Sequence, residues 1–105
     1  MPLIADTPTP PYYAVIFTST RTEDDDGYNE MAAKMMELAA QQFGFLGVET
    51  AREEVGITVS YWQDINSIKA WKKNAEHRVA QQLGKERWYS GFTLRIAKVE
   101  REYSM

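Results

Sequence analysis

The sequence predicts a single α+β domain in which helices cover one face of an antiparallel sheet. Four segments have the alternation or the β-branched and aromatic content of strands, and two regions carry apolar residues at helical spacing. Along the chain they follow the order strand, helix, strand, strand, helix pair, strand. This is the β-α-β-β-α-β order of a ferredoxin-like sandwich.

The chain opens with a leader and a strand. Residues 1–11 contain four prolines, which fix φ and remove backbone donors, so we expect an extended arm or a frayed end outside the core. Residues 12–105 are expected to form the domain. The first strand is predicted over Tyr12–Thr20, and its two largely apolar faces are typical of a central strand covered on both sides.

The first helix is predicted over about Asp25–Phe43. The acidic run Glu23–Asp26 offers candidate N-caps at the positive end of the helix dipole, and Gly44 suits a left-handed position after the helix. Metal binding by the acidic run is the alternative to capping, and we favour capping. Methionines at helical spacing are interpreted as core filling rather than as a ligand site.

Two strands, Phe45–Arg52 and Ile57–Trp62, are predicted to form a hairpin. Alternation implies that Ile16 and Trp62 cannot share the helix-covered side with Phe17 and Tyr61. A sheet face without helices would then expose apolar groups. A homodimer packed sheet against sheet is the simplest way to cover that face.

The second helical region is predicted to begin at a cap, either Asp64 or Asn66, and to break or bend at Lys72–Ala75. A helix then continues over Glu76–Tyr89. The last strand is predicted over Gly91–Glu102. Its alternation changes phase after Ile96, which indicates a bulge or burial on both faces.

Composition excludes several classes of function. The 105 residues include 12 basic and 15 acidic side chains, giving a net charge of −3, and this disfavours binding to nucleic acid or to an anionic membrane. No apolar run could span a bilayer, and no signal peptide is evident. Without cysteine and with one histidine, no metal site is expected. We expect a cytoplasmic protein.

His77 is the one side chain whose ordinary pKa lies near neutrality. On a helix it would share a stripe with Gln81, Gly84 and Trp88, and the glycine could admit a ligand or let the helix approach the sheet. The stripe therefore indicates either a pocket or a His77 that caps the helix or bonds a backbone carbonyl.

Four aromatic residues could form a wall between the sheet and the helices, which suits a flat aromatic substrate. Ordinary core and interface packing is the alternative interpretation. The residues are Trp62, Trp71, Trp88 and Tyr89.

Several segments together resemble the antibiotic biosynthesis monooxygenase domain family, over about Tyr12–Tyr103. They are the runs Phe45–Glu49, Gly56–Asp64, Ile68–Lys72, Glu76-His77, Ala80-Gln81, Gly84, Trp88-Tyr89 and Arg95–Tyr103. The resemblance is strongest to an uncharacterised bacterial branch. It implies a dimeric α+β barrel, formed by two ferredoxin-like subunits packed through their sheets, with a cavity between sheet and helices in each subunit.

Members of this family include cofactor-free monooxygenases, quinol-oxidising proteins and haem-degrading proteins. Haem-degrading relatives keep an Asn on the first strand, a Trp on the second helix and a haem-ligating His ten residues later. Trp71 matches that Trp, but Gln81 stands at the ligand position and Ile16 and Phe17 occupy the first strand. Haem degradation is therefore not expected.

The leading hypothesis is a cofactor-free oxygenase or oxidase that acts with O₂ on an electron-rich aromatic, such as a hydroquinone or a phenolic polyketide. His77 would be the general base. Trp62, Trp71, Gln81, Gly84, Trp88 and Tyr89 are the candidate substrate-binding residues. The alternatives are a non-catalytic ligand-binding or stress-associated homodimer, and an assembly protein whose cavity is filled by tryptophan side chains.

Overall fold

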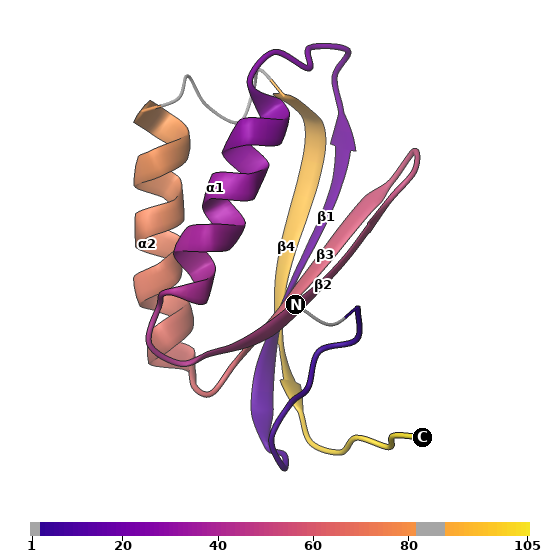
Figure 1. Cartoon of the computed structure of the whole chain (residues 1–105), viewed down its shortest axis with the longest axis vertical. Coiled ribbons are helices and arrows are strands. Elements are labelled where there is room, and N and C mark those ends of the chain that lie inside the picture. Colours follow the sequence, from indigo (N-terminus) through magenta and orange to yellow (C-terminus); the bar gives the residue numbers. More distant parts are fainter. Residues whose placement is uncertain (1–2, 82–87) are drawn as a thin grey trace.

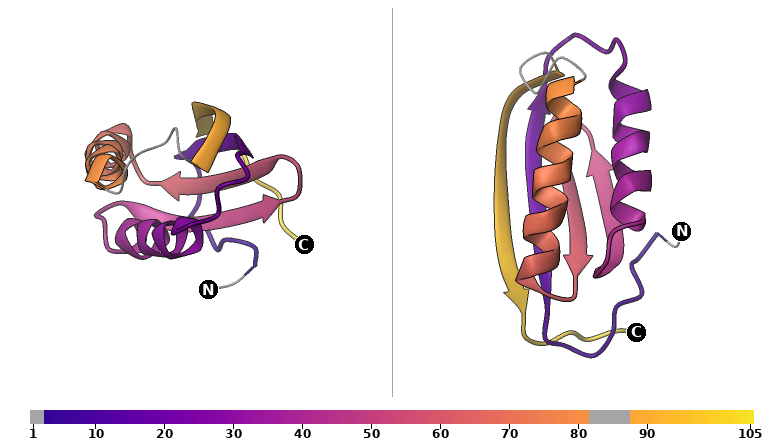
Figure 2. Two further views of the ribbon diagram at one scale, coloured as in Figure 1. Left: turned by 90° about the horizontal axis from the view of Figure 1, so that it is seen from above. Right: turned by 90° about the vertical axis from the view of Figure 1, so that its left-hand side faces the viewer.

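The structure is a computed structural model that describes residues 3–81 and 88–105, and only the backbone of residues 76–81. A four-stranded antiparallel sheet has the strand order β2-β3-β1-β4. Both helices lie on one face of it (Figures 1 and 2). The elements are β1 (Tyr12–Arg21), α1 (Tyr28–Ala40), β2 (Phe45–Arg52), β3 (Gly56–Trp62), α2 (Ile65–Gln81) and β4 (Tyr89–Val99). The predicted ferredoxin-like fold is confirmed.

The register between β1 and β3 decides which side chains meet the helices. Tyr13 opposes Trp62 and Phe17 opposes Thr58, so Phe17 and Trp62 lie on the same face of the sheet. Tyr61 opposes Ala14 and lies on the other face. The predicted grouping of Phe17 with Tyr61 is wrong, because alternation orders residues within one strand but does not give the register with the next.

The core lies between the lower part of the sheet and the helices. Its buried residues are Val15, Ala39, Trp62 and Ile68. Trp62 is fully buried, and its indole Nε1 donates a hydrogen bond to Ser60 Oγ at 2.9 Å. A buried indole N–H therefore has an acceptor, as buried polar groups require.

Helix α1 begins and ends inside its predicted bounds. Its N-cap is Gly27, at φ 79°, and no side chain caps it, so the prediction of an acidic N-cap is wrong. Asp25 instead forms an ion pair with Arg21, with 3.0 Å between Asp25 Oδ1 and Arg21 Nη2. After the helix, Gly44 has φ 86°, and a Cβ there would lie 2.2 Å from Ser67 Oγ at the start of α2. Glycine is thus required by both conformation and space.

Helix α2 is continuous through Lys72–Ala75, where a break was predicted. Of the two predicted caps, Asp64 is the one observed. Its Oδ1 accepts a hydrogen bond from the Ser67 amide at 2.7 Å. Tyr89 begins β4, so the predicted helix over Glu76–Tyr89 is wrong at its end. The β1–β4 register shifts only at Thr20/Arg21, and the strand has no bulge after Ile96.

The leader lies on the side of the sheet away from the helices (Figure 1). The Ala5 amide donates to Glu49 Oε2 at 3.0 Å, and a Cβ on Gly47 would lie 2.9 Å from the Ala5 Cβ. The described part of the leader is therefore an arm held against β2. None of the helices in the described residues is long and apolar enough to cross a membrane.

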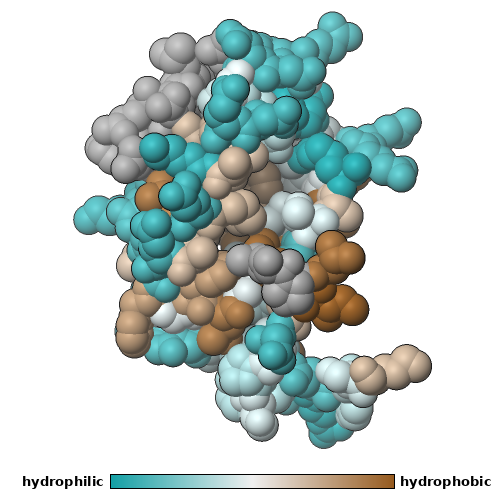
Figure 3. Space-filling model, in the orientation of Figure 1, coloured by the Kyte–Doolittle hydropathy of each residue, from teal (hydrophilic) through white to brown (hydrophobic). Residues whose placement is uncertain are grey.

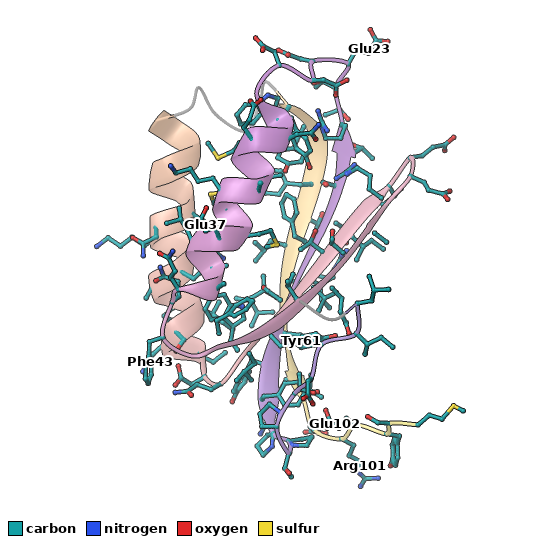
Figure 4. The ribbon with its side chains drawn as sticks, in the orientation of Figure 1. Glu23, Glu37, Phe43, Tyr61, Arg101 and Glu102 are labelled. Carbon is teal, nitrogen blue, oxygen red and sulfur yellow. The ribbon has the colours of Figure 1, made fainter. Side chains whose placement is uncertain are left out.

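Two tyrosine–glutamate pairs lie on this same side of the sheet, where Figure 4 labels Tyr61 and Glu102. Tyr61 donates to Glu49 and Tyr12 donates to Glu102, each at 2.5 Å. Burial and then the bond to Glu49 raise the pKa of Tyr61, while the bond from Tyr12 lowers the pKa of Glu102. The Tyr12–Glu102 bond holds the C-terminal tail to β1, whereas Glu49 joins β2 to Tyr61 of β3 and also accepts the amide of Ala5 from the N-terminal arm.

The Asp64 cap predicts a pH-dependent stability. Its hydrogen bonds from Ser67 hold the pKa of Asp64 below the ordinary 3.8, so the stabilisation is present above pH 3.8 and is lost as pH falls through the folded-state pKa. Asp64→Ala should lower the melting temperature at pH 7, whereas Asp64→Asn should retain most of the cap. Thermal unfolding between pH 2 and 7 measures this. Equal melting temperatures for Asp64→Ala and the wild type at pH 7 would contradict it.

Candidate functional site

A cavity of about 540 Å³ opens between the helices and the sheet. This is within the usual range of small-molecule sites, roughly 300–1,000 Å³. The wall is mostly apolar and comes from α1, α2 and all four strands. Among its apolar members are Val15, Phe17, Met31, Ala32, Met35, Met36, Ala39, Ile68, Trp71, Phe92 and Leu94. Weakly hydrophobic surface also runs along the outside of α1 (Figure 3).

The methionines of α1 line this cavity as well as filling space. Met31 is buried, and Met31, Met35 and Met36 all belong to the wall. Unbranched thioether side chains adapt to irregular shapes, so this side of the cavity can fit ligands of differing outline.

Trp71 forms the wall at the lower end of the cavity, and Trp62 lies behind it. The two indoles stack at 6.1 Å between ring centroids with an interplanar angle of 22°. Trp62 is fully buried and is not a wall residue. Of this pair, Trp71 can contact a ligand, and Trp62 fixes the plane of its ring.

Trp88 and Tyr89 have different positions although they are adjacent in sequence. Trp88 is buried outside the cavity wall, and its Nε1 donates to the Asp26 carbonyl at 2.9 Å. Tyr89 belongs to the wall and meets Phe17 edge-to-face, with centroids 5.4 Å apart. Trp88 thus ties the start of β4 to the turn before α1, and Tyr89 faces the cavity.

The side chains of the other predicted site residues lie outside the part of the chain that the structure describes. His77 and Gln81 belong to α2, where the structure describes only their backbone, and Gly84 lies outside the described residues. In the part of the chain whose side chains are described, no three His, Asp or Glu residues gather closely enough to hold a metal ion.

Sequence reasoning missed Tyr28 and Arg52, both of which belong to the cavity wall. The sequence places Tyr28 within the first predicted helix and Arg52 at the end of a predicted strand, and it predicts neither as a site residue. A signal for Arg52 exists in the hairpin itself, because Gly56 is its cross-strand partner and leaves the space that the guanidinium occupies.

The upper end of the cavity carries a pair of phenols. The Tyr89 hydroxyl donates to the Tyr28 hydroxyl over 3.5 Å, and the Tyr28 ring lies under the Arg21 guanidinium at 3.3 Å. Burial, followed by the bond to Tyr28, raises the pKa of Tyr89, whereas Arg52 and Arg21 act in the opposite direction. At neutral pH Tyr89 is therefore a proton-bearing phenol that can donate a hydrogen bond.

Both the sequence and the fold have relatives among known proteins. Residues 11–83 match the sequence model of the family described as antibiotic biosynthesis monooxygenase. The chain belongs to this family. It is 49% identical over 104 residues to the Uncharacterized protein YqjZ of Bacillus subtilis (strain 168), covering 97% of this chain and 91% of that protein.

Solved structures of low sequence identity share the fold. PA3566 from Pseudomonas aeruginosa has a TM-score of 0.66 at 14% identity, over 90% of this chain and 98% of that one. SnoaB from Streptomyces nogalater, described as a cofactor-independent oxygenase, also has a TM-score of 0.66, at 11% identity, over 91% of this chain and 98% of its own. At such identities the likeness concerns the fold alone.

The Trp62–Trp71 stack predicts the cost of removing Trp71. Trp71→Ala should lower the free energy of unfolding by about 2–3 kcal/mol, less than for a fully buried tryptophan because Trp71 is half-buried. It should also remove the near-ultraviolet circular dichroism of the stacked indoles. Trp71→Phe should restore most of the stability, and Lys73→Ala, an exposed change in the same helix, is the control. A Trp71→Ala protein as stable as the control would contradict the stacking.

Proposed function

We propose that the protein is a cofactor-independent monooxygenase or oxidase that acts with O₂ on a small electron-rich aromatic compound. The observation that carries the proposal is the cavity, whose wall combines the flat surface of Trp71, the methionines of α1 and a phenol pair at the other end. Membership of the antibiotic biosynthesis monooxygenase family supports it.

In this proposal the substrate supplies the electrons. A phenol or hydroquinone loses a proton, and the electron-rich anion transfers one electron to O₂. As an oxidase, the protein would convert a hydroquinone and O₂ into a quinone and H₂O₂. As a monooxygenase, it would convert a phenol and O₂ into a quinone and water, with one oxygen atom of O₂ in each product. The mostly apolar wall of the cavity would limit the access of water to the reactive anion.

His77 is the proposed general base, because it is the one side chain in the chain with an ordinary pKa near neutrality. Trp71 and Tyr89 are the proposed substrate contacts within the described wall. Gln81 and Gly84 remain proposed substrate contacts from the sequence. Trp62 supports the site through its stack with Trp71, and Trp88 by anchoring the start of β4.

Oxygen uptake tests the activity and the base together. Metal-free protein, with a panel of hydroquinones and phenolic polycycles, should consume O₂ faster than the spontaneous rate. His77→Ala should lower kcat/KM by roughly a hundredfold or more, the usual contribution of a general base. Lys73→Ala is the control in the same helix. Unchanged turnover in His77→Ala would remove His77 from the mechanism.

Catalase added after the reaction separates the two chemistries. Half of the consumed O₂ returns if H₂O₂ is the product, and none returns if one oxygen atom enters the product and the other becomes water.

If no panel member stimulates uptake but ligands still quench tryptophan fluorescence saturably, the protein is a non-catalytic ligand-binding protein. The third interpretation, a cavity filled by tryptophan, is wrong, since Trp62, Trp71 and Trp88 leave the cavity open.

We also propose a homodimer formed through the sheet face opposite the helices. Ile16, Ile57 and Val59 lie on that face, and Ile57 is 45% exposed. Exposed apolar side chains on a sheet face favour a covering partner.

Ile57→Glu should therefore convert a dimer to a 12.1 kDa monomer in multi-angle light scattering, because it places a charge within the apolar contact. Phe43→Glu is the control, since Phe43 is exposed at the turn after α1, away from this face (Figure 4). A wild-type protein that is monomeric at micromolar concentrations would contradict the dimer.

A further inference from the structure

The cavity differs in polarity along its length. Register places Val15 beside Ser60 low in the sheet, and Ser19 beside Gly56 higher up, next to Arg52. Tyr89 lies higher still, opposite Arg21. Trp71 belongs to the low end through its stack on Trp62. Trp71 therefore lies at one end, whereas a guanidinium and two phenols lie at the other, beside the rings of Phe17 and Phe92.

Arg52 projects over the sheet on its helix-covered face. It donates a hydrogen bond to Ser19 Oγ, and a Cβ on Gly56 would lie 2.1 Å from the Arg52 guanidinium. The Arg52 guanidinium thus packs against the backbone of β3 at Gly56. Any residue larger than glycine at position 56 would place its side chain where the guanidinium lies. This placement brings a cation to the rim of the upper cavity, where the Arg52 side chain remains exposed to solvent.

The two arginines near Tyr89 differ in their partners. Arg21 pairs with Asp25 and also donates to the carbonyl oxygens of Asp24 and Trp88. Arg52 has no ion pair with a carboxylate in the part of the chain that the structure describes. Ser19 uses one of the five guanidinium N–H donors, so Arg52 retains both charge and donors.

We propose that this end of the cavity binds the anionic oxygen of an aromatic ligand, a phenolate or an enolate, between the Arg52 guanidinium and the Tyr28 hydroxyl. The inference rests on the proposed function in that it names the ligand class of the same cavity. Tyr28 accepts its hydrogen bond from Tyr89, so the Tyr28 proton can be donated to the ligand. The rings of the ligand then extend along Phe17 towards Trp71.

An oxyanion is the ligand group that Arg52 can bind most strongly. Arg52 is exposed to solvent at the rim of the cavity, and a ligand oxyanion there would accept a charge-assisted hydrogen bond from its guanidinium. Lys72, the other basic side chain of the described wall, already has an interaction of its own. Arg52 is therefore the specificity-determining cation, selecting anionic over neutral rings.

Binding of a matched probe pair tests this without any turnover. The probes are 2,4-dinitro-1-naphthol, which is a phenolate at pH 7, and its O-methyl ether, measured by quenching of tryptophan fluorescence under nitrogen. The wild type should bind the phenolate more tightly than the ether. Arg52→Gln should weaken phenolate binding by roughly tenfold to a hundredfold, the value of a charged hydrogen bond, and leave ether binding unchanged.

Two further variants make the test specific. Gly56→Ala keeps the charge but displaces the Arg52 head, so it should also weaken phenolate binding. Arg101→Gln removes one positive charge from the C-terminal tail, remote from the cavity in Figure 4, and should have no effect. Together they separate the position of the cation from the net charge.

Equal affinities for phenolate and ether, no binding of the phenolate, or an Arg52→Gln protein with wild-type affinity would overturn the inference. Selective phenolate binding lost in Arg52→Gln would support it even if no substrate stimulates oxygen uptake. Conversely, oxygen uptake with unselective binding would leave the proposed activity standing and refute the role of Arg52.

Discussion

The antiparallel register between β1 and β3 is the constraint on which the rest of the structure depends. By setting Trp62 opposite Tyr13, it buries the indole on the helix-covered face, where Trp71 stacks on it. A shift of one residue would exchange the faces and place Tyr61 there instead. The same register places Gly56 beside Ser19, and thereby fixes where the Arg52 guanidinium can lie.

The cavity follows from this arrangement because the helices leave part of the sheet uncovered. Helix α2 packs closely at its start, where Ile68 is buried, whereas Phe92 and Leu94 on β4 remain substantially exposed although they face the helices. Aromatic rings line the space at both ends, whereas the Arg52 guanidinium and the tyrosine hydroxyls lie at its upper end. Polar groups confined to one end orient a flat ligand with an acidic oxygen as well as holding it.

The sequence was sufficient for the order of the elements, because alternation and helical spacing are local properties. It was insufficient for the face on which Trp62 lies, which depends on the pairing of two strands. The continuity of α2 through Lys72–Ala75 was missed since packing overrides a weak local signal. The place of Arg52 in the cavity wall was missed because it depends on Gly56 across the hairpin. Neither residue, taken alone in the sequence, indicates this contact.

A crystal structure with a bound bromine-labelled phenol, such as 6-bromo-2-naphthol, is the most direct test that the cavity is the ligand site. The bromine can be located by its anomalous signal independently of the fit of the rings. The account predicts the bromine between the helices and the sheet, with the naphthol oxygen towards Arg52 and the rings towards Trp71. A bromine found only on the sheet face opposite the helices, with the cavity empty, would contradict it.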